Sequence, residues 1–403
     1  MSHRALILAG LAHGTSTITG LSAGLDVRHT RQIIQALGVK ITESADGTLA
    51  VQGGALTEPV GDLDVGNSGT GARLLAGVCA GQPFRSVITG DASIAARPMD
   101  RVTEPLRAMG AQIDGREGGR FTPLAIRGGN LRGIDHTPPI ASAQVKSAIL
   151  LAGLFADGQT IVREQVVTRR HTEEMMAEHG VSVATERTER GGNVVTLHPG
   201  PVQPGSFTVP GDPSQAAFWI CAAAAVPGSD VTVESLYLSP ERSGFLDVLT
   251  DMGADLEVNT TAGTVRVRGG ELHGTVVDGE RLPDLIDEVP ALAVAGALAG
   301  SGSVRFENAA ELRAKESDRI DTVAAMITAL GGQVATTADS LEVSAAPLKA
   351  GRVISHHDHR IAMAAAVAST AMAEGSVIEI DDWGCVATSY PGFLDDLALL
   401  NGA

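Results

Sequence analysis

The sequence contains six copies of one pattern, in which an apolar helix is followed by a glycine turn and a β-branched strand. The turn glycines are spaced by 67 to 77 residues. They are Gly14, Gly81, Gly158, Gly228, Gly302 and Gly375. Self-similarity at a nearly constant period indicates a repeat architecture. The chain is therefore expected to consist of six similar units.

A second series of glycines follows the first, each at the end of an amphipathic segment and before a strand. Their spacing is 70 to 78 residues. They are Gly38, Gly110, Gly180, Gly253, Gly331 and Gly402. Glycine commonly ends a helix because it adopts the left-handed conformation without steric cost. Each unit is predicted to run helix, strand, helix, strand, strand, so the fold class is α/β.

With three units per domain, the chain divides into two similar domains, residues 1–211 and 212–403. No linker marks this boundary, so it follows from the repeat count alone. The first copy has no strand before its helix, and the last has no closing strands. We therefore expect an N-terminal segment to supply the strand missing from the first domain. On that hypothesis the 403-residue form is weakly active or inactive and less stable, because an unpaired sheet position exposes strand edges.

Charge and cysteine content narrow the possible partners and compartments. The net charge of −17 argues against nucleic acid, because phosphate backbones require a basic surface. Three cysteines without a CxxC spacing argue against disulfides and favour the cytoplasm. No apolar run approaches the ~20 residues of a membrane span. A monomer is expected, because no coiled-coil or exposed apolar stripe is evident.

Polar residues concentrate in the loops before the repeat helices. Helix N-termini suit anions because their N–H groups are free and carry partial positive charge. The loops are Ser2-His3-Arg4, Gly66-Asn67-Ser68-Gly69-Thr70, Ser142-Ala143-Gln144, Asp287-Glu288, Lys315-Glu316-Ser317-Asp318-Arg319 and Asp358-His359-Arg360. Arg97 and Thr168-Arg169 are further polar residues that lie just outside these loops. The basic residues indicate an anionic small-molecule ligand if they converge on one site.

Each motif also has a purely structural interpretation. Lys315 and Arg319 with acids between them are typical of a solvated salt-bridge face. Ser142 is a good helix cap, and Arg97-Pro98 is a common surface turn. The run of residues 356–359 invites a metal-site interpretation, but consecutive residues cannot all face one ion. The occurrence of these motifs together, in equivalent loops of the repeats, favours a shared site.

Seven motifs in order resemble those of the 5-enolpyruvylshikimate-3-phosphate synthase family. They are GNSGTGARLL, RPMDRVTEPLRAMGA, SAQVKSAILLAG, TRRHTEEM, ELRAKESDRI, DHRIAM and ATSYPGF. The resemblance covers roughly residues 2–395, with features of the class II branch. It implies the enolpyruvyl transferase fold, an inside-out α/β barrel of three βαβαββ-type units per domain. It also implies enolpyruvyl transfer from phosphoenolpyruvate to the 5-hydroxyl of shikimate 3-phosphate, with phosphate release and no metal or organic cofactor.

The resemblance assigns site residues position by position. Asp287 is expected to be the base near the attacking hydroxyl, and Glu316 the proton shuttle at the methylene carbon. The phosphoenolpyruvate ligands are Gly69, Arg97, Gln144, Arg319 and Arg360. The shikimate 3-phosphate ligands are Arg4, Ser142, Ala143, Gln144, Arg169, Asp287 and Lys315. This places the chain in the shikimate pathway of aromatic amino acid biosynthesis, with small molecules as its partners.

Three positions depart from the family or add to its pattern. The first motif of the family runs Lys-Ser, then an apolar residue, then Ser-x-Arg. Here Met1 stands at the apolar position and Ser2-His3-Arg4 follows, but the Lys-Ser is missing. This suggests that Met1 is an internal position of a longer natural protein. Thr388 stands where some members carry a lysine that binds phosphoenolpyruvate. Gly69 leaves room for the inhibitor glyphosate. Two alternatives stay open: a non-catalytic homologue that binds an anion, and the related transferase acting on UDP-N-acetylglucosamine, which uses a loop cysteine as its acid.

Overall fold

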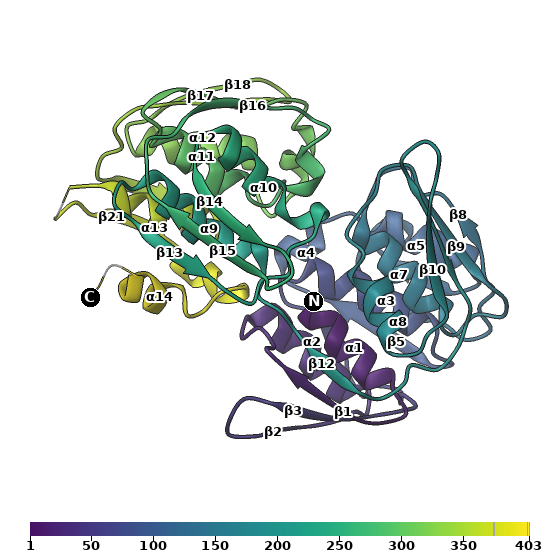
Figure 1. Ribbon diagram of the computed structural model, residues 1–403. Helices are drawn as coiled ribbons and strands as arrows, with labels where there is room; N and C mark the ends of the chain where they lie inside the picture. The colour runs from purple at the N-terminus through teal and green to yellow at the C-terminus, as the bar shows by residue number, and fades with distance from the viewer. Residues whose placement is uncertain (374, 401, 403) are drawn as a thin grey trace. The chain divides into compact units, whose positions relative to one another are not determined.

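The computed structural model describes residues 1–373, 375–400 and 402. The chain divides into two compact units, Met1–Val209 and Pro210–Ala403 (Figure 1). The boundary expected from the repeats, between residues 211 and 212, lies two residues further along. Each unit has its own core of buried apolar residues.

The centre of the first unit is formed by apolar helices α1 (Ser2–Leu11), α3 (Gly69–Ala80) and α7 (Ala143–Gly153). Almost every residue of these helices is buried, as expected for helices that are apolar on all sides. Small residues bring the helices close together. An added Cβ at Gly77 of α3 would collide with the carbonyl oxygen of Ala148 of α7.

Sheets with one shared strand order surround these helices. The sheets are, strand by strand, β12 (Ser206–Thr208), β1 (Gly14–Thr19), β3 (Leu49–Gly53) and β2 (Lys40–Glu43); β4 (Leu63–Asp64), β5 (Arg85–Thr89), β7 (Phe121–Arg127) and β6 (Gln112–Gly115); and β8 (Asp135–His136), β9 (Thr160–Glu164), β11 (Asn193–Leu197) and β10 (Val183–Arg187). In each sheet the first pair is parallel and the others are antiparallel.

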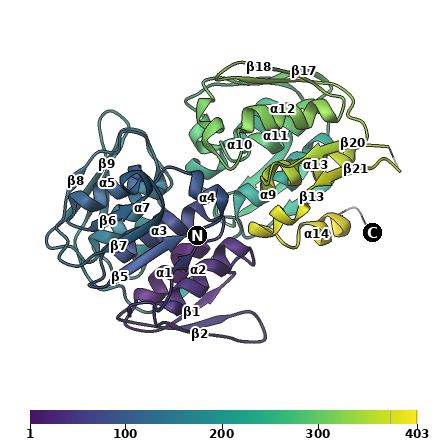
Figure 2. The same cartoon turned by 180° about the vertical axis from the view of Figure 1, so that it is seen from behind.

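Amphipathic helices complete each repeat of the first unit. They are α2 (Leu25–Ala36), α5 (Asp100–Ala108) and α8 (His171–Glu178), with short helices α4 (Ala92–Ala96) and α6 (Arg116–Gly119) inserted in the second repeat. In Figures 1 and 2 the helices lie in the middle of the unit, with β1–β3 along one side and β8–β10 along another.

The second unit repeats this arrangement around α9 (Pro213–Ala225), α11 (Val289–Ala297) and α13 (His359–Ala368). Its outer helices are α10 (Pro240–Asp251), α12 (Arg319–Ala329) and α14 (Phe393–Leu400), with 3₁₀ turns η1 (Leu282–Asp284), η2 (Ala310–Ala314), η3 (Ser369–Ala371) and η4 (Trp383–Thr388). The sheets are β16 (His273–Val277), β17 (Ser301–Phe306), β19 (Leu341–Ser344) and β18 (Gln333–Thr336); β13 (Asp230–Val233), β15 (Thr264–Arg268) and β14 (Asp255–Asn259); and β20 (Gly351–Ile354) with β21 (Ile378–Asp381).

The repeat pattern predicted from the sequence is confirmed. All six glycines of the second series have positive φ, from 72° at Gly402 to 115° at Gly110. One detail differs from expectation. The position beside β1, predicted to be unpaired, is occupied by β12, which runs parallel to it with Ile18 opposite Phe207. Among the described residues, the sheet of β13 has three strands and lacks a parallel neighbour on that strand.

Candidate functional site

Most of the predicted residues lie at the N-termini of the inner helices and of α12, and at α3, α7, α12 and α13 a side chain caps the exposed N–H groups. Ser68 accepts a hydrogen bond from the Gly71 N–H at 2.9 Å, and Ser142 accepts one from Val145 at 3.4 Å. In the second unit Asp318 and Asp358 cap α12 and α13. Such caps, typically worth ~1 kcal/mol, begin these helices at the polar loops.

In the first unit Arg97 lies beside Gly69, as the motifs predict. The guanidinium donates to Ser93 Oγ at 3.0 Å and to Asn67 Oδ1 at 3.4 Å. A Cβ added at Gly69 would stand 2.9 Å from Arg97 Nη1. Two of the predicted phosphoenolpyruvate ligands are therefore neighbours at the start of α3.

Arg73, one turn into α3, contacts two of the predicted ligands and was not among the residues predicted from the motifs. Its Nη1 donates to Gln144 Oε1 at 2.5 Å and lies 3.5 Å from the carbonyl oxygen of Gly69. Gln144 in turn donates from Nε2 to Thr70 Oγ1 at 2.9 Å. These bonds join the start of α7 to the start of α3. The i,i+4 spacing of Arg73 from Gly69 could have identified it.

Arg4 is buried between α1, α7 and α8. Its Nε donates to Thr172 Oγ1 at 2.6 Å and its Nη2 to Ser147 Oγ at 2.9 Å. Ser147 Oγ also donates to the carbonyl oxygen of Ala143 at 2.7 Å. Arg4 thus reaches the first turn of α7, which carries the predicted ligands Ser142, Ala143 and Gln144. Arg169 is half-buried in the loop between β9 and α8.

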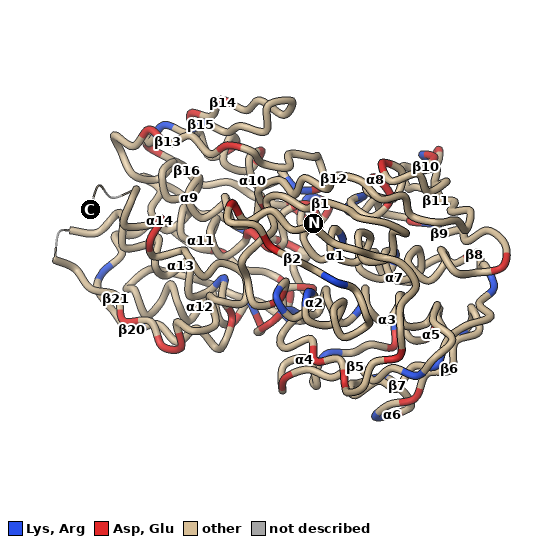
Figure 3. The backbone as a smooth tube through the Cα atoms, turned by 90° about the horizontal axis from the view of Figure 1, so that it is seen from below, with Lys and Arg blue, Asp and Glu red and all other residues tan. Residues whose placement is uncertain are grey.

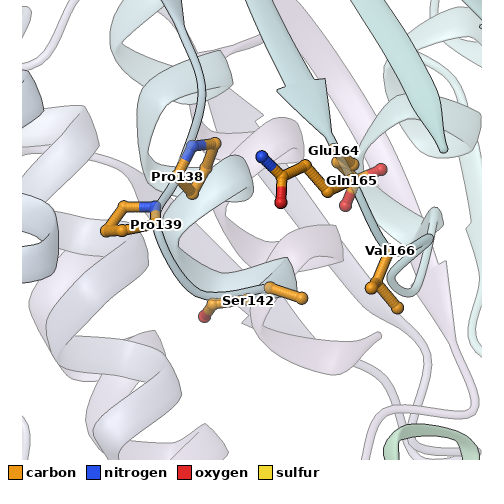
Figure 4. A pocket seen from close by; sticks show the side chains of 7 residues that line it. Pro138, Pro139, Ser142, Glu164, Gln165 and Val166 are labelled. Carbon is orange, nitrogen blue, oxygen red and sulfur yellow. The ribbon is translucent and has the colours of Figure 1, made fainter. Parts of the chain in front are cut away.

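A small cavity of about 110 Å³ lies next to Ser142 (Figure 4). The segment before α7 forms one wall with Pro138 and Pro139, and the end of β9 forms another with Glu164 and Gln165. The end of β9 and the N-terminus of α7 therefore face one another across an open space.

In the second unit one arginine connects both predicted catalytic carboxylates. Arg319 is fully buried. Its Nη2 lies 2.6 Å from Glu316 Oε2, its Nη1 3.2 Å from Asp287 Oδ1, and its Nε 2.9 Å from Asp358 Oδ2. The alternative interpretation of Lys315 and Arg319 as a solvated salt-bridge face is therefore excluded for Arg319. Its positive charge is enclosed among carboxylates from three loops.

The electrostatics of this cluster favour its charged forms. Burial alone opposes charge on Arg319, but the neighbouring carboxylates raise its pKa above the ordinary value. Burial also opposes charge on Asp358, yet the Arg319 guanidinium holds the pKa of that carboxyl below its ordinary value. Asp358 also accepts a hydrogen bond from Ser317 Oγ at 2.9 Å, and this bond restrains the loop that carries Glu316.

The remaining predicted residues of the second unit lie around this cluster. Arg360 Nη1 donates to the Asp287 carbonyl oxygen at 3.2 Å. Lys315 is half-buried immediately after η2, next to Glu316. Thr388 donates to the carbonyl oxygen of Cys385 at 2.7 Å and lies 3.3 Å from His359 Nδ1. Thr388 therefore makes local contacts in the position where some family members carry lysine.

The run of residues 356–359 does not gather around one point. His357 pairs with Asp382, whereas Asp358 faces Arg319 and His359 faces Thr388. Within the described residues, no group of three or more His, Cys, Asp or Glu side chains is arranged to hold a metal ion. Helices long and apolar enough to span a bilayer are likewise not found in that part of the chain.

The three cysteines are buried, Cys79 in α3, Cys221 in α9 and Cys385 in η4, where its Sγ lies 3.7 Å from Ser355 Oγ. Burial raises the pKa of the Cys79 thiol to about 11 and also raises that of Cys221. Acidic residues lie along the whole chain, as the red segments in Figure 3 show. The clustered arginines at the helix N-termini are therefore local exceptions in a chain of net charge −17.

Comparisons with known proteins agree with the motif order. The profile of the EPSP synthase (3-phosphoshikimate 1-carboxyvinyltransferase) family matches residues 1–397. A 3-phosphoshikimate 1-carboxyvinyltransferase of Gluconobacter oxydans is 47% identical, over 98% of this chain and 91% of the relative. That of Pelotomaculum thermopropionicum is 48% identical over 99% of this chain and 93% of its own length. A solved structure of EPSP synthase from Acinetobacter baumannii superimposes with a TM-score of 0.85 at 39% identity, covering 99% of this chain and 92% of that one.

Proposed function

The chain belongs to the EPSP synthase family, and on that premise we propose that it transfers the enolpyruvyl group of phosphoenolpyruvate to the 5-hydroxyl of shikimate 3-phosphate. Inorganic phosphate is released, and the product serves aromatic amino acid biosynthesis. One observation supports the chemistry most directly. The carboxylates of Asp287 and Glu316 both contact the guanidinium of Arg319.

The reaction needs one group for the hydroxyl proton and one for the carbon proton. Asp287 removes the proton from the 5-hydroxyl as its oxygen bonds to C2 of phosphoenolpyruvate. Glu316 delivers a proton to the methylene carbon and takes one back when the C–O bond to phosphate breaks. Positioned carboxylates typically contribute about 10²–10⁴-fold to such proton transfers. Their contacts with a buried arginine restrict the orientation of both.

The proposed anion ligands hold the two substrates. Arg97, Arg319, Arg360, Gln144 and the Gly69 backbone bind phosphoenolpyruvate. Arg4, Ser142, Ala143, Gln144, Arg169, Asp287 and Lys315 bind shikimate 3-phosphate. Arginine suits this task because its planar fork binds carboxylate and phosphate with two hydrogen bonds. Local cations in an acidic protein also raise the concentration of anionic substrates where they react.

The location and assembly of the protein are part of the proposal. Three free, buried thiols suit a reducing compartment, so we assign the chain to the cytoplasm. We also propose a monomer. The burial of all three cysteines removes support for a transferase that uses an exposed loop cysteine as its acid.

A phosphate-release assay with shikimate 3-phosphate and phosphoenolpyruvate tests the proposal. Release should require both substrates. Asp287→Asn and Glu316→Gln should each lower kcat about 10²–10⁴-fold while shikimate 3-phosphate still binds in calorimetry. Glu307→Gln, which alters an exposed pair with Arg305, is the control and should retain activity. Binding without release by the wild-type chain would identify a non-catalytic homologue, and absence of binding would contradict the proposal.

A further inference from the structure

A lysine is fully buried in the first unit at a place that the proposed reaction does not use. Lys146 lies in α7, one turn after Ser142, and its N–H donates to the Ser142 carbonyl oxygen at 3.1 Å. Its Nζ lies 2.9 Å from Glu164 Oε2 and 2.7 Å from Glu173 Oε1. Both glutamate side chains are only 4% exposed. We call these three residues the Lys146 cluster.

The Lys146 cluster ties both ends of one loop to α7. Glu164 is the last residue of β9, and Glu173 lies in the first turn of α8. The loop between them, residues 165–170, carries Arg169. Its middle is held as well, because the Thr168 carbonyl oxygen lies 3.4 Å from Lys146 Nζ and the Thr168 hydroxyl donates to Glu164 Oε1.

The neighbours of the cluster in the sequence hold a second proposed ligand. Ser147 follows Lys146 and Thr172 precedes Glu173, and these two hydroxyls bind the Arg4 guanidinium. The same contact between α7 and α8 therefore fixes loop 165–170 on one side and Arg4 on the other. The cavity beside Ser142 is bordered by Glu164 of the cluster (Figure 4).

Stability alone is a poor explanation for such a cluster. Burial raises the pKa of Glu173 despite the nearby ammonium of Lys146. Removing the carboxylate from water therefore costs more free energy than its attraction to Lys146 returns. Replacing buried ion pairs by apolar residues of similar volume is often neutral or stabilising. The cluster does what apolar packing cannot: directional hydrogen bonds fix the course of a polar loop.

We propose that the Lys146 cluster is a positioning device that holds loop 165–170, and with it Arg169, beside the N-terminus of α7, and so sets the affinity for shikimate 3-phosphate. This inference rests on the proposed function. Lys146, Glu164 and Glu173 are positioning residues, because they act through Arg169, Arg4 and the Ser142 turn rather than by touching substrate.

The mildest test removes the link between the loop and the cluster. Thr168→Val keeps the volume of the side chain but deletes the hydroxyl that donates to Glu164. We expect the Kd for shikimate 3-phosphate in calorimetry to rise about three- to tenfold, the effect of losing ~0.7–1.4 kcal/mol. The KM for phosphoenolpyruvate and kcat should change less than about twofold. Thr168→Ser restores the hydroxyl and should restore the wild-type Kd.

A stronger variant removes every charge of the cluster together, so that no buried ion is left unpaired. Lys146→Met with Glu164→Gln and Glu173→Gln should raise the same Kd at least about tenfold, a ~1.4 kcal/mol loss. Arg163→Gln is the matched control: it lies beside Glu164 on β9 but forms an exposed pair with Asp135, and should bind normally.

The outcomes separate this inference from the proposed function. If the wild-type chain binds shikimate 3-phosphate and releases phosphate, but Thr168→Val and the triple variant bind it with unchanged Kd, the positioning role is refuted. A lowered Tm with unchanged Kd would refute it too, since it would show a structural role only. Failure of the wild-type chain to bind would overturn the proposed function and, with it, this inference.

Discussion

Nη2 of Arg319 donates a hydrogen bond to Oε2 of Glu316 at 2.6 Å, across one turn of chain at the start of α12. This contact holds the proposed proton shuttle against a guanidinium that is itself fully buried. Nη1 and Nε of Arg319 donate to Asp287 and Asp358. The geometry of both proposed catalytic carboxylates therefore depends on one side chain with a planar, multiple-donor head.

Arg319→Lys should keep the positive charge and lose the geometry. A lysine ammonium is a single point and cannot reach three carboxylates from three loops as the guanidinium does. Displacement of reacting groups by about 1 Å can cost ~10²-fold in rate, so we expect kcat for phosphate release to fall by about that factor. Arg305→Lys, in an exposed pair on β17, is the control. Near-normal kcat in Arg319→Lys would show that charge alone suffices.

Asp358→Asn should destabilise the protein in a pH-dependent way. Removing one partner of a buried pair commonly costs about 3–5 kcal/mol. Because the pKa of Asp358 lies below its ordinary value, its contribution is fully present above the unfolded-state pKa of about 3.9 and is lost as the pH falls further. Urea unfolding of both proteins should therefore show a large gap near pH 7 that narrows below about pH 4. A gap independent of pH would contradict this account.

The repeat pattern and the site loops were predictable because they depend on local chemistry. Gly110 and Gly253 end helices in the left-handed conformation, which only local sterics require. Ser68 and Ser142 cap helices for equally local reasons. The helix-ending glycines recur in every repeat, and together with the caps they locate the polar loops without reference to any tertiary contact.

Contacts between residues far apart in the chain were not predictable in the same way. In the sequence, Lys146 is an ordinary polar residue within a predicted helix. No local pattern indicates that Glu164 and Glu173 form ion pairs with it. For Arg319 the sequence left an exposed salt-bridge face open as an alternative, which only the contacts with Asp287 and Asp358 exclude. The pairing of β12 with β1 also escaped the repeat count, because it joins the two ends of the first unit.

The cysteines should be unreactive in the folded protein. Cys79 and Cys221 are at most 1% exposed, and burial raises the pKa of both thiols, so little thiolate is present near neutral pH. Treatment with iodoacetamide at pH 7.5 (about one unit below the pKa of a free thiol) should leave phosphate release unchanged. Mass spectrometry should find full labelling only after unfolding in guanidinium. Rapid inactivation under native conditions would instead indicate a thiol with a part in catalysis.

Gly69→Ala should alter the phosphoenolpyruvate site through Arg97. The new methyl group would stand 2.9 Å from Arg97 Nη1 and 3.1 Å from Arg73 Nη1, so the flexible ends of both side chains must shift by a few tenths of an ångström. We expect glyphosate to inhibit the wild-type chain and to inhibit Gly69→Ala at least about tenfold more weakly, a ~1.4 kcal/mol difference. Inhibition constants measured against phosphoenolpyruvate test this. Equal constants would rule out the steric account.

Arg73→Met should weaken substrate binding without unfolding the protein. Arg73 donates to Gln144 Oε1 while Thr70 Oγ1 accepts from Gln144 Nε2, so these two bonds together set which way the amide points. Without Arg73 the amide can rotate, and hydrogen bonds to a charged group contribute about 1.5–3 kcal/mol. The KM for both substrates should therefore rise about tenfold, with kcat changed much less. Arg31→Met, which removes an exposed pair with Glu43, is the control and should keep both KM values. If Arg73→Met also kept them, Gln144 would have to be oriented by Thr70 alone.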